Sequence, residues 1–280
     1  MQFDLKDFIK NALLEDIGDG DHSSLASIPK NTQNKAILKI KADGIIAGID
    51  VAVQVFEMVD KNLTIQILKK DGDVIKNGEI AFEVSGNAIS ILTAERLVLN
   101  FMQRMSGIAT YTHFLTQKIK HTHCQLLDTR KTTPGFRYFE KLAVKIGGGQ
   151  NHRFGLYDMI MLKDNHIDFA GGIENAIKST HQYLKSNNKN LKIEIETRSI
   201  DDVKKVLEIG GIDRIMLDNF PPSEMKKAVE LINNRFETEA SGGITENNIV
   251  EYAETGVNFI SVGALTHQIK SLDLSLKAVQ

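Results

Sequence analysis

The chain has 280 residues, more than the usual domain of about 100–150, so it forms either one large α/β barrel or two medium domains. Its 34 lysine and arginine residues nearly balance its 36 aspartate and glutamate residues, which argues against a protein that coats nucleic acid or a membrane surface. With 42% hydrophobic and 25% charged residues, the composition is that of a globular protein and excludes disorder as the main state.

A single cysteine, Cys124, cannot form an internal disulfide, so a secreted, disulfide-held scaffold is excluded. We expect this thiol to be buried and inert, because a catalytic cysteine needs basic neighbours. The N-terminal residues 1–7 lack the basic start and apolar core of a signal peptide. No apolar run approaches the roughly 18 residues of a membrane span. The sequence therefore predicts a soluble protein of a reducing compartment.

The first hundred residues mix helix and strand signals. Apolar residues at helical spacing predict an N-terminal helix, which the polar cluster at 18–24 ends. Alternating apolar residues predict strands over 36–42 and 64–68, and a long helix is expected over 90–110. Strands followed by a helix indicate an α+β unit.

From about residue 125 the pattern changes and repeats. Short apolar runs each finish in a polar or small residue, at 126–129, 159–163, 193–196, 214–218, 236–241 and 259–263. Amphipathic stretches such as 201–209 and 222–232 separate them, and the spacing of about 22 residues matches one strand plus one helix. Serial units of this kind predict a parallel sheet, either doubly wound or closed. We favour a barrel, with fewer than the usual eight strands.

The residues at the ends of these strands would meet at one mouth of a barrel. They are Asp128, Arg130, Lys131, Lys163, Glu196, Asp218, Ser241 and Gly263. A polar residue can simply mark where a strand leaves the core, but six runs that end this way favour a shared mouth. Five basic residues lie in or beside these turns: Arg130, Lys131, His152, Arg153 and Lys163. Several cations together predict a polyanionic small-molecule ligand, and the scarcity of aromatic residues argues against nucleic acid.

Two further features point to phosphate and sugar binding. Ser241-Gly242-Gly243 follows a strand and is expected to open a helix, whose backbone N–H groups and dipole would hold an anion together with Gly263-Ala264 on the next strand. Glu196 and Asp218 either neutralise the basic residues or bind ribose hydroxyls or magnesium with phosphate. The sequence has no zinc-ligand spacing, Walker loop or Rossmann fingerprint.

Taken together, these motifs closely resemble the quinolinate phosphoribosyltransferase family. The resemblance rests on 128–135, 147–153, 163–166, 216–219 and 241–244, and also on 15–18, 94–96, 99–100, 106–110 and 261–267. It covers nearly the whole chain. Phe136 departs from the family pattern, in which a leucine is expected after the Pro-Gly pair.

The resemblance implies an α/β protein with an N-terminal α/β sandwich at 1–112 and an incomplete, TIM-like α/β barrel at 113–267. A C-terminal segment at 268–280 would return to the first domain. It also implies a cytoplasmic, magnesium-dependent homodimer or assembly of dimers, with no nucleic-acid or membrane partner. The implied reaction joins quinolinate to phosphoribosyl pyrophosphate and gives nicotinate mononucleotide, pyrophosphate and carbon dioxide on the route to NAD.

The family match also implies roles for individual residues. Arg130, His152 and Arg153 would grip the quinolinate carboxylates, and Arg96 would reach in from the partner subunit. The catalytic set would be Lys131 and Lys163, which meet phosphates or the ring carboxylate, and Glu196 and Asp218, which meet ribose hydroxyls and magnesium. The 5′-phosphate would lie in a cradle made by Ser241, Gly242, Gly243, Gly263 and Ala264.

Three alternatives remain open at this point. One is the molybdenum-transport-associated homologue, which shares the fold and much of the mouth. Another makes Lys163 the Schiff-base lysine of a barrel aldolase, because a lysine at a strand end suits that role. The third is a non-enzymatic protein that binds phosphorylated metabolites, which would show ligand affinity without turnover.

Overall fold

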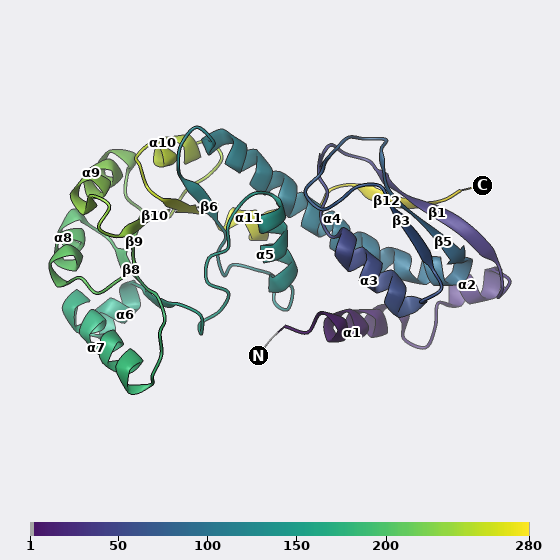
Figure 1. Cartoon of the computed structure of the whole chain (residues 1–280), viewed down its shortest axis with the longest axis horizontal. Coiled ribbons are helices and arrows are strands. Elements are labelled where there is room, and N and C mark those ends of the chain that lie inside the picture. The colour runs from purple at the N-terminus through teal and green to yellow at the C-terminus, as the bar shows by residue number, and fades with distance from the viewer. Residues whose placement is uncertain (1–2, 280) are drawn as a thin grey trace. The chain divides into compact units, whose positions relative to one another are not determined.

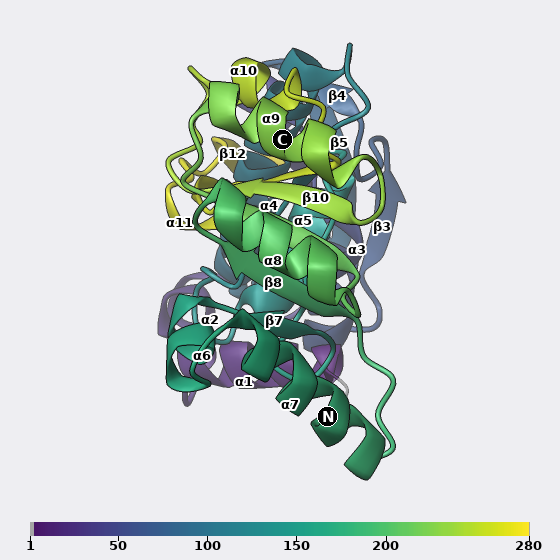
Figure 2. The same ribbon diagram turned by 90° about the vertical axis from the view of Figure 1, so that its left-hand side faces the viewer.

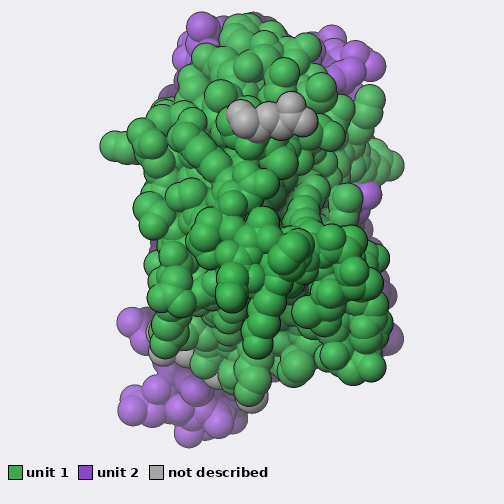
Figure 3. All heavy atoms as spheres, turned by 90° about the vertical axis from the view of Figure 1, so that its right-hand side faces the viewer, with its two compact units in different colours: residues 1–113, 133–148, 268–280 green, residues 114–132, 149–267 purple. Residues whose placement is uncertain are grey.

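The computed structural model describes residues 3–279, so Met1 and Gln2, which entered the signal-peptide argument, lie outside the described residues. Contacts within the chain divide it into two compact units. Unit 1 comprises residues 1–113, 133–148 and 268–280, and unit 2 comprises residues 114–132 and 149–267 (Figure 3). None of the helices in the described part of the chain is long and apolar enough to cross a bilayer.

Unit 1 contains an antiparallel sheet whose strands run in the order β12-β1-β5-β3. Their bounds are β1 (Gln33–Ile40), β3 (Thr64–Ile67), β5 (Ile80–Asn87) and β12 (Leu274–Val279), and a separate pair is formed by β2 (Gly44–Ile45) and β4 (Val74–Ile75). The helices of this part are α1 (Leu5–Ile17), α2 (His22–Ser27), α3 (Ile49–Val59), α4 (Ala88–Ile119) and α5 (Arg137–Ile146). The predicted N-terminal helix, two strands and long helix are thus confirmed.

The core of unit 1 is formed by buried residues that alternate along its strands and by the buried sides of its helices. On β1, Ala36, Leu38 and Ile40 alternate toward the buried side of the sheet, as expected for a half-covered strand. On α3, Phe56 is fully buried and meets Phe82 of β5 edge-on, with ring centroids 5.9 Å apart. The far end of the chain completes this sheet, because β12 pairs with β1.

Residues 133–148 belong to unit 1 by their contacts, although the sequence analysis grouped them with the barrel. The reason is an aromatic cluster. Phe136 stacks on Phe101 of α4 at 5.4 Å, and Phe139 packs against Phe8 of α1 at 5.0 Å. Phe136 is the position where the family pattern predicts leucine, and here its ring takes part in this cluster.

Unit 2 contains a six-stranded parallel sheet in the order β6-β11-β10-β9-β8-β7. All six predicted strands are present: β6 (Gln125–Leu127), β7 (Ile160–Leu162), β8 (Ile193–Thr197), β9 (Arg214–Asp218), β10 (Glu237–Ser241) and β11 (Phe259–Ser261). The helices are α6 (Asp164–Phe169), α7 (Ile173–Ser186), α8 (Ile200–Ile209), α9 (Pro222–Ile232), α10 (Ile249–Ala253) and α11 (Ala264–His267). Figures 1 and 2 show α7, α8 and α9 covering the outer face of these strands.

The α/β fold class, with one antiparallel and one parallel part, is confirmed. In the described residues β6 and β7 are the two edges of the parallel sheet, and an isolated bridge joins Leu127 to Gln150 beyond β6. Closure into an incomplete barrel stays a prediction. Cys124 is buried just before β6, and burial raises the pKa of its thiol to about 12, which confirms the expectation of an inert thiol.

Candidate active site

The register of unit 2 places three of the predicted strand-end residues, Glu196, Asp218 and Ser241, on one face of the parallel sheet. Side chains two residues apart on a strand share a face, and so do partners in register on neighbouring strands. Asp218 is in register with Ser241, and Glu196 is in register with Met216, two residues before Asp218. We call the side of the sheet that carries Glu196, Asp218 and Ser241 the site face.

The loop that carries the predicted basic pair is pinned to the end of β6. Asp128 is fully buried, and its Oδ1 accepts the backbone N–H of His152 at 2.9 Å. Its Oδ2 accepts a hydrogen bond from the Asn151 side chain at 2.5 Å. A buried carboxylate that receives such donors fixes the backbone next to it. Asp128 therefore acts as the anchor of the loop at 149–153.

Two arginines approach each other beside this anchor. The Arg153 guanidinium is half-buried and donates from Nη1 to the Met159 carbonyl at 3.2 Å. Burial and the positive charge of Arg130 both lower the pKa of Arg153. Two cations held within electrostatic reach of one another are disfavoured unless an anion joins them. Arg130 and Arg153 therefore form a candidate anion-binding pair.

Lys131 is brought against the neighbouring strand β11. Its carbonyl accepts a hydrogen bond from the Thr266 hydroxyl at 2.7 Å, and its N–H donates to the Thr129 hydroxyl at 3.0 Å. A Cβ atom added at Gly263 would come within 3.0 Å of Cδ of Lys131. Glycine at 263 therefore lets the lysine side chain cross the end of β11.

Acidic residues occupy the ends of β8 and β9. Nζ of Lys163 lies 3.9 Å from Oε2 of Glu196, whose side chain is nearly buried. Burial and the nearby charge of Asp218 raise the pKa of Glu196, and Lys163 opposes this shift. Asp218 accepts a hydrogen bond from the Asn219 side chain at 2.6 Å. This pair of neighbouring carboxylates is a donor set that fits a hard divalent cation such as magnesium.

The Gly242-Gly243 turn passes closely over Asn219. Gly242 has φ +92°, and a Cβ atom there would collide with the backbone N and side-chain Oδ1 of Asn219. The expected helix does not follow directly, because α10 begins only at Ile249 and is five residues long. Instead, Asn248 accepts the Thr245 N–H at 2.7 Å and holds a tight turn. The helix-dipole part of the phosphate argument is therefore wrong.

Arg96 is set apart from the other predicted site residues. It lies on α4 in unit 1 and is exposed, whereas every other predicted residue belongs to unit 2. Its role in a partner's site stays a prediction.

Below the strand ends, the site face carries a layer of buried charge that the sequence analysis missed. Arg214 is in register with Glu194 on one side and Glu237 on the other, and Glu239 follows two residues later. Nη1 of Arg214 lies 3.0 Å from Oε2 of Glu239, which is fully buried, as is Glu194. The signal was available: strands of a parallel sheet are buried on both faces, so charged residues inside them must meet partners.

His152 reaches into this layer. Its Nε2 lies 3.0 Å from Oε2 of Glu194 and 3.2 Å from Oε2 of Glu239. Burial lowers the pKa of His152, whereas the carboxylates of Glu194 and Glu239 act to raise it. The N–H of Arg153, 2.7 Å from Nδ1, opposes a second ring proton because it needs the lone pair of that nitrogen. We therefore assign the neutral ring with its proton on Nε2.

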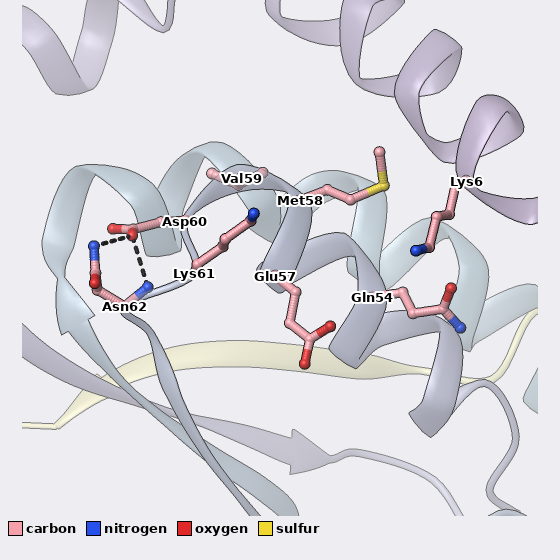
Figure 4. Close-up of a pocket in the computed structure, with 8 residues that line it drawn as sticks. All are labelled: Lys6, Gln54, Glu57, Met58, Val59, Asp60, Lys61 and Asn62. Carbon is pink, nitrogen blue, oxygen red and sulfur yellow. Dashed lines mark hydrogen bonds between the residues drawn. The ribbon is translucent and has the colours of Figure 1, made fainter.

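A hollow of about 860 Å³ lies in unit 1 and is lined by none of the predicted site residues. It is lined by side chains of α3, by Lys6 of α1 and by the turn after α3 (Figure 4). Asp60 in that turn is already engaged, since it accepts the N–H of Asn62 at 2.9 Å. The hollow shows no set of like charges that would hold a polyanion, so it is not the candidate site.

Comparison with known proteins identifies the family of the chain. Residues 21–106 match the N-terminal domain and residues 108–277 the C-terminal domain described as quinolinate phosphoribosyl transferase. The chain is 50% identical to the chloroplastic nicotinate-nucleotide pyrophosphorylase [carboxylating] of Arabidopsis thaliana, over 98% of this chain and 83% of the relative. It is 43% identical to a probable enzyme of the same name from Bacillus subtilis, over 97% and 92% of the two chains.

Solved structures give the same result. The nicotinate-nucleotide pyrophosphorylase of Francisella tularensis superposes with a TM-score of 0.92 at 39% identity, over 98% of this chain and 96% of that chain. Both halves of the sequence and the arrangement of its elements therefore agree with one set of relatives. The chain belongs to the quinolinate phosphoribosyltransferase family.

Proposed function

We propose that this protein transfers the phosphoribosyl group of phosphoribosyl pyrophosphate to quinolinate and decarboxylates the product. Nicotinate mononucleotide, pyrophosphate and carbon dioxide are released, and the reaction serves NAD biosynthesis. The observation that carries the proposal is that the charge of Arg130 acts on Arg153, while Glu196 and Asp218 interact at the ends of the neighbouring strands β8 and β9. The first pair suits an acidic pyridine and the second suits a ribose, and the relatives' names supply both substrates.

The quinolinate side of the site is assigned to the two arginines and Lys163. A planar guanidinium pairs with a carboxylate through two parallel hydrogen bonds, so Arg130 and Arg153 would each meet one acid group. Lys131 and Lys163 would meet the pyrophosphate or the ring carboxylate. The predicted contact of His152 with a carboxylate is set aside here, because both nitrogens of its ring lie against protein groups.

The phosphoribosyl side is assigned to the strand ends of β8 to β11. Glu196 and Asp218 would accept hydrogen bonds from the ribose hydroxyls. The close turn at Ser241-Gly242-Gly243 and the backbone at Gly263-Ala264 would offer N–H groups to the 5′-phosphate, since backbone N–H groups in such turns bind anions well. In the proposed arrangement the reactive carbon of the sugar would face the arginine pair.

Positioning and charge stabilisation would supply most of the catalysis. As pyrophosphate leaves, the ribosyl carbon gains positive charge, and the carboxylates of Glu196 and Asp218 stabilise it through space. Bond formation makes the ring nitrogen cationic, so the ring accepts the electron pair released when carbon dioxide departs. The substrate is then its own electron sink, and the mechanism needs no covalent enzyme intermediate.

We further propose magnesium as the metal, held by pyrophosphate oxygens together with Glu196 and Asp218. Two neighbouring carboxylates at the end of the sheet support this, because the charge of Asp218 disfavours the ionised form of Glu196 unless a cation is bound. Bound magnesium would neutralise charge on the leaving pyrophosphate.

The assembly is proposed to be a homodimer or an assembly of dimers in which Arg96 completes the partner's site. Its exposure on α4 is compatible with this role. A cytoplasmic location is also proposed. The lone buried thiol of Cys124 supports a reducing compartment, although plant relatives are named as chloroplastic or mitochondrial proteins.

The decisive experiment incubates purified protein with quinolinate, phosphoribosyl pyrophosphate and magnesium. Nicotinate mononucleotide is measured by chromatography and labelled carbon dioxide from carboxyl-labelled quinolinate. We expect equal amounts of both products from the wild type, and far smaller amounts of both from Arg153→Ala. Absence of product with the wild-type protein would refute the function. Borohydride trapping of a carbonyl substrate on Lys163 would instead support an aldolase.

A further inference from the structure

His152 is held by protein groups on both edges of its ring. Nδ1 accepts the N–H of the next residue, Arg153, at 2.7 Å, and Nε2 faces the carboxylates of Glu194 and Glu239 at 3.0 and 3.2 Å. The side chain is only 5% exposed. A ring engaged in this way has no nitrogen directed at a ligand in the open end of the site, whereas the guanidinium of Arg153 is only half-buried.

The carboxylates below the ring are themselves held in place. Glu194 lies on β8, Glu239 on β10, and Arg214 on the strand between them. Arg214 contacts Glu239 at 3.0 Å and Glu237 at 2.9 Å, and its guanidinium stacks over the ring of Phe259 at 4.1 Å. Three neighbouring strands and one stacked aromatic thus fix these charges, and a side chain supported by such a layer has little freedom to move.

The loop above is fixed at a second point. Asp128 accepts the backbone N–H of His152 at 2.9 Å, so the backbone at 152 is tied to β6 while the ring is tied to β8 and β10. The hydrogen bond from the Arg153 N–H to Nδ1 then also fixes the backbone of Arg153. The line of contacts runs from the interior of the sheet to the residue that we assign to quinolinate.

We propose that His152 is a positioning residue that acts through Arg153, with Glu194, Glu239 and Arg214 as its buried support, and that it does not itself contact quinolinate. The inference rests on the proposed function, since it concerns how the site for that substrate is built. It changes the role that the family resemblance implied for this histidine.

The two ring nitrogens can be tested separately. In His152→Asn the amide oxygen takes the place of Nδ1 and can still accept the Arg153 N–H, whereas His152→Gln places its amide near Nε2 and loses that acceptor. We expect His152→Gln to raise the KM for quinolinate by about 10- to 100-fold, with a smaller change in kcat and in the KM for phosphoribosyl pyrophosphate. His152→Asn should restore a large part of the loss. Equal damage by both variants would contradict the Nδ1 contact.

A double-mutant cycle separates action through Arg153 from direct contact. If His152 works only by placing Arg153, then His152→Gln should cost less than about twofold in kcat/KM once Arg153→Ala is present. If the imidazole touches quinolinate, the two losses should multiply. That second outcome would overturn the proposal.

The support below the ring is tested with Glu239→Gln, which keeps the side-chain shape but removes the charge that faces Nε2. We expect the same quinolinate KM effect as for His152→Gln, and again little further loss when Arg153→Ala is added. His121→Gln is the matched control, because His121 forms an exposed pair with Glu254 at 3.1 Å and should leave the kinetics unchanged. A Glu239→Gln protein with wild-type kinetics would contradict the supporting role.

Two readouts do not depend on turnover. Nitrogen-15 NMR of labelled histidine should show a lone pair on Nδ1 of His152 and a proton on Nε2, and a ring protonated on both nitrogens would contradict the assignment. Elemental analysis should find no stoichiometric zinc, since a metal bound by His152, Glu194 and Glu239 would overturn the proposal. If wild-type protein makes no product while these two results hold, the proposed function fails and the buried contacts stand.

Discussion

Both units bury a glutamate, and they use it differently. In unit 1, Glu140 of α5 is fully buried, and Oε1 accepts from Arg104 of α4 at 2.7 Å and from the Thr133 hydroxyl at 2.9 Å. Its Oε2 accepts the Thr133 N–H at 3.0 Å. In unit 2, Glu194 and Glu239 lie below His152, and the contacts continue to Arg153 at the strand ends.

The partners of a buried carboxylate indicate whether its charge affects the stability of the fold or the position of a ligand-binding residue. The carboxylate of Glu140 is surrounded by partners on α4 and in the segment before α5, so we expect it to stabilise the packing of these elements. A carboxylate that faces a residue next to a ligand-binding side chain can determine where that side chain lies. We therefore expect substitutions in the first cluster to change stability and substitutions in the second to change kinetics.

The largest effect should come from breaking the cluster in unit 1. Arg104→Ala leaves Glu140 buried without its cation, which should lower the free energy of unfolding by about 3–5 kcal/mol. Urea unfolding followed by circular dichroism measures this. Arg198→Ala is the matched control, because Arg198 pairs with Asp168 at 2.9 Å on the exposed surface, where a pair contributes little. Equal losses in both variants would remove the distinction between buried and exposed pairs.

In unit 2, Arg130→Ala should leave the unfolding midpoint close to that of the wild type, because this side chain is exposed. Its kcat/KM for quinolinate should fall by about 30- to 5,000-fold, which corresponds to about 2–5 kcal/mol for removal of one partner of a charged contact. Steady-state kinetics with quinolinate varied at saturating phosphoribosyl pyrophosphate tests this. A variant with near wild-type efficiency would reject the role of Arg130.

A complementation experiment joins the two units. If Arg96 of one subunit completes the site that holds Arg153 of the other, mixing the strongly impaired Arg96→Ala and Arg153→Ala proteins should form hybrid dimers with one intact site each. Random exchange would then return up to about a quarter of wild-type activity, since half of the dimers would be hybrids. Subunit exchange has to be measured independently. Complete exchange without activity would count against the shared site.

The smallest expected effect is a pH-dependent change in the melting temperature, and it comes from a carboxyl group in unit 1. Asp71 accepts the N–H of Ile49 at 2.8 Å, but burial, with the nearby charge of Asp50, raises its pKa. The folded state therefore holds this proton more tightly, and the stability gained is lost as pH rises through the raised pKa. The melting temperature of Asp71→Asn should thus rise relative to wild type between about pH 4 and pH 7.

Asp43→Asn gives the opposite sign and serves as the control. The N–H of Asn77 and the side chain of Lys76 lower the pKa of Asp43, so its contribution is present at neutral pH and is lost as pH falls. Its melting temperature relative to wild type should fall as pH rises. Parallel curves for the two variants would contradict both assignments.

Much of unit 2 could be predicted from the sequence, because each strand ends in a polar residue and the interval between strands is regular. Lys163, Glu196, Asp218 and Ser241 were assigned in this way. The buried charge layer of Glu194 and Glu239 was not, because the sequence does not show which side chains of other strands and loops will meet these carboxylates. The pairing of β12 with β1 could not be predicted from local sequence patterns either, because these two strands are far apart in the chain. The start of α10 was missed because Asn248 holds a turn that competes with helix.

The state of Cys124 makes the chain convenient for chemical labelling. Its thiol is buried and stays protonated at neutral pH, and the sequence has neither a second cysteine nor a tryptophan. A cysteine introduced at an exposed site such as Lys226 would therefore be the one reactive position for a maleimide dye. When one batch carries a donor dye and another an acceptor dye, energy transfer between them would report the exchange of subunits. Tryptophan fluorescence would not contribute to the background.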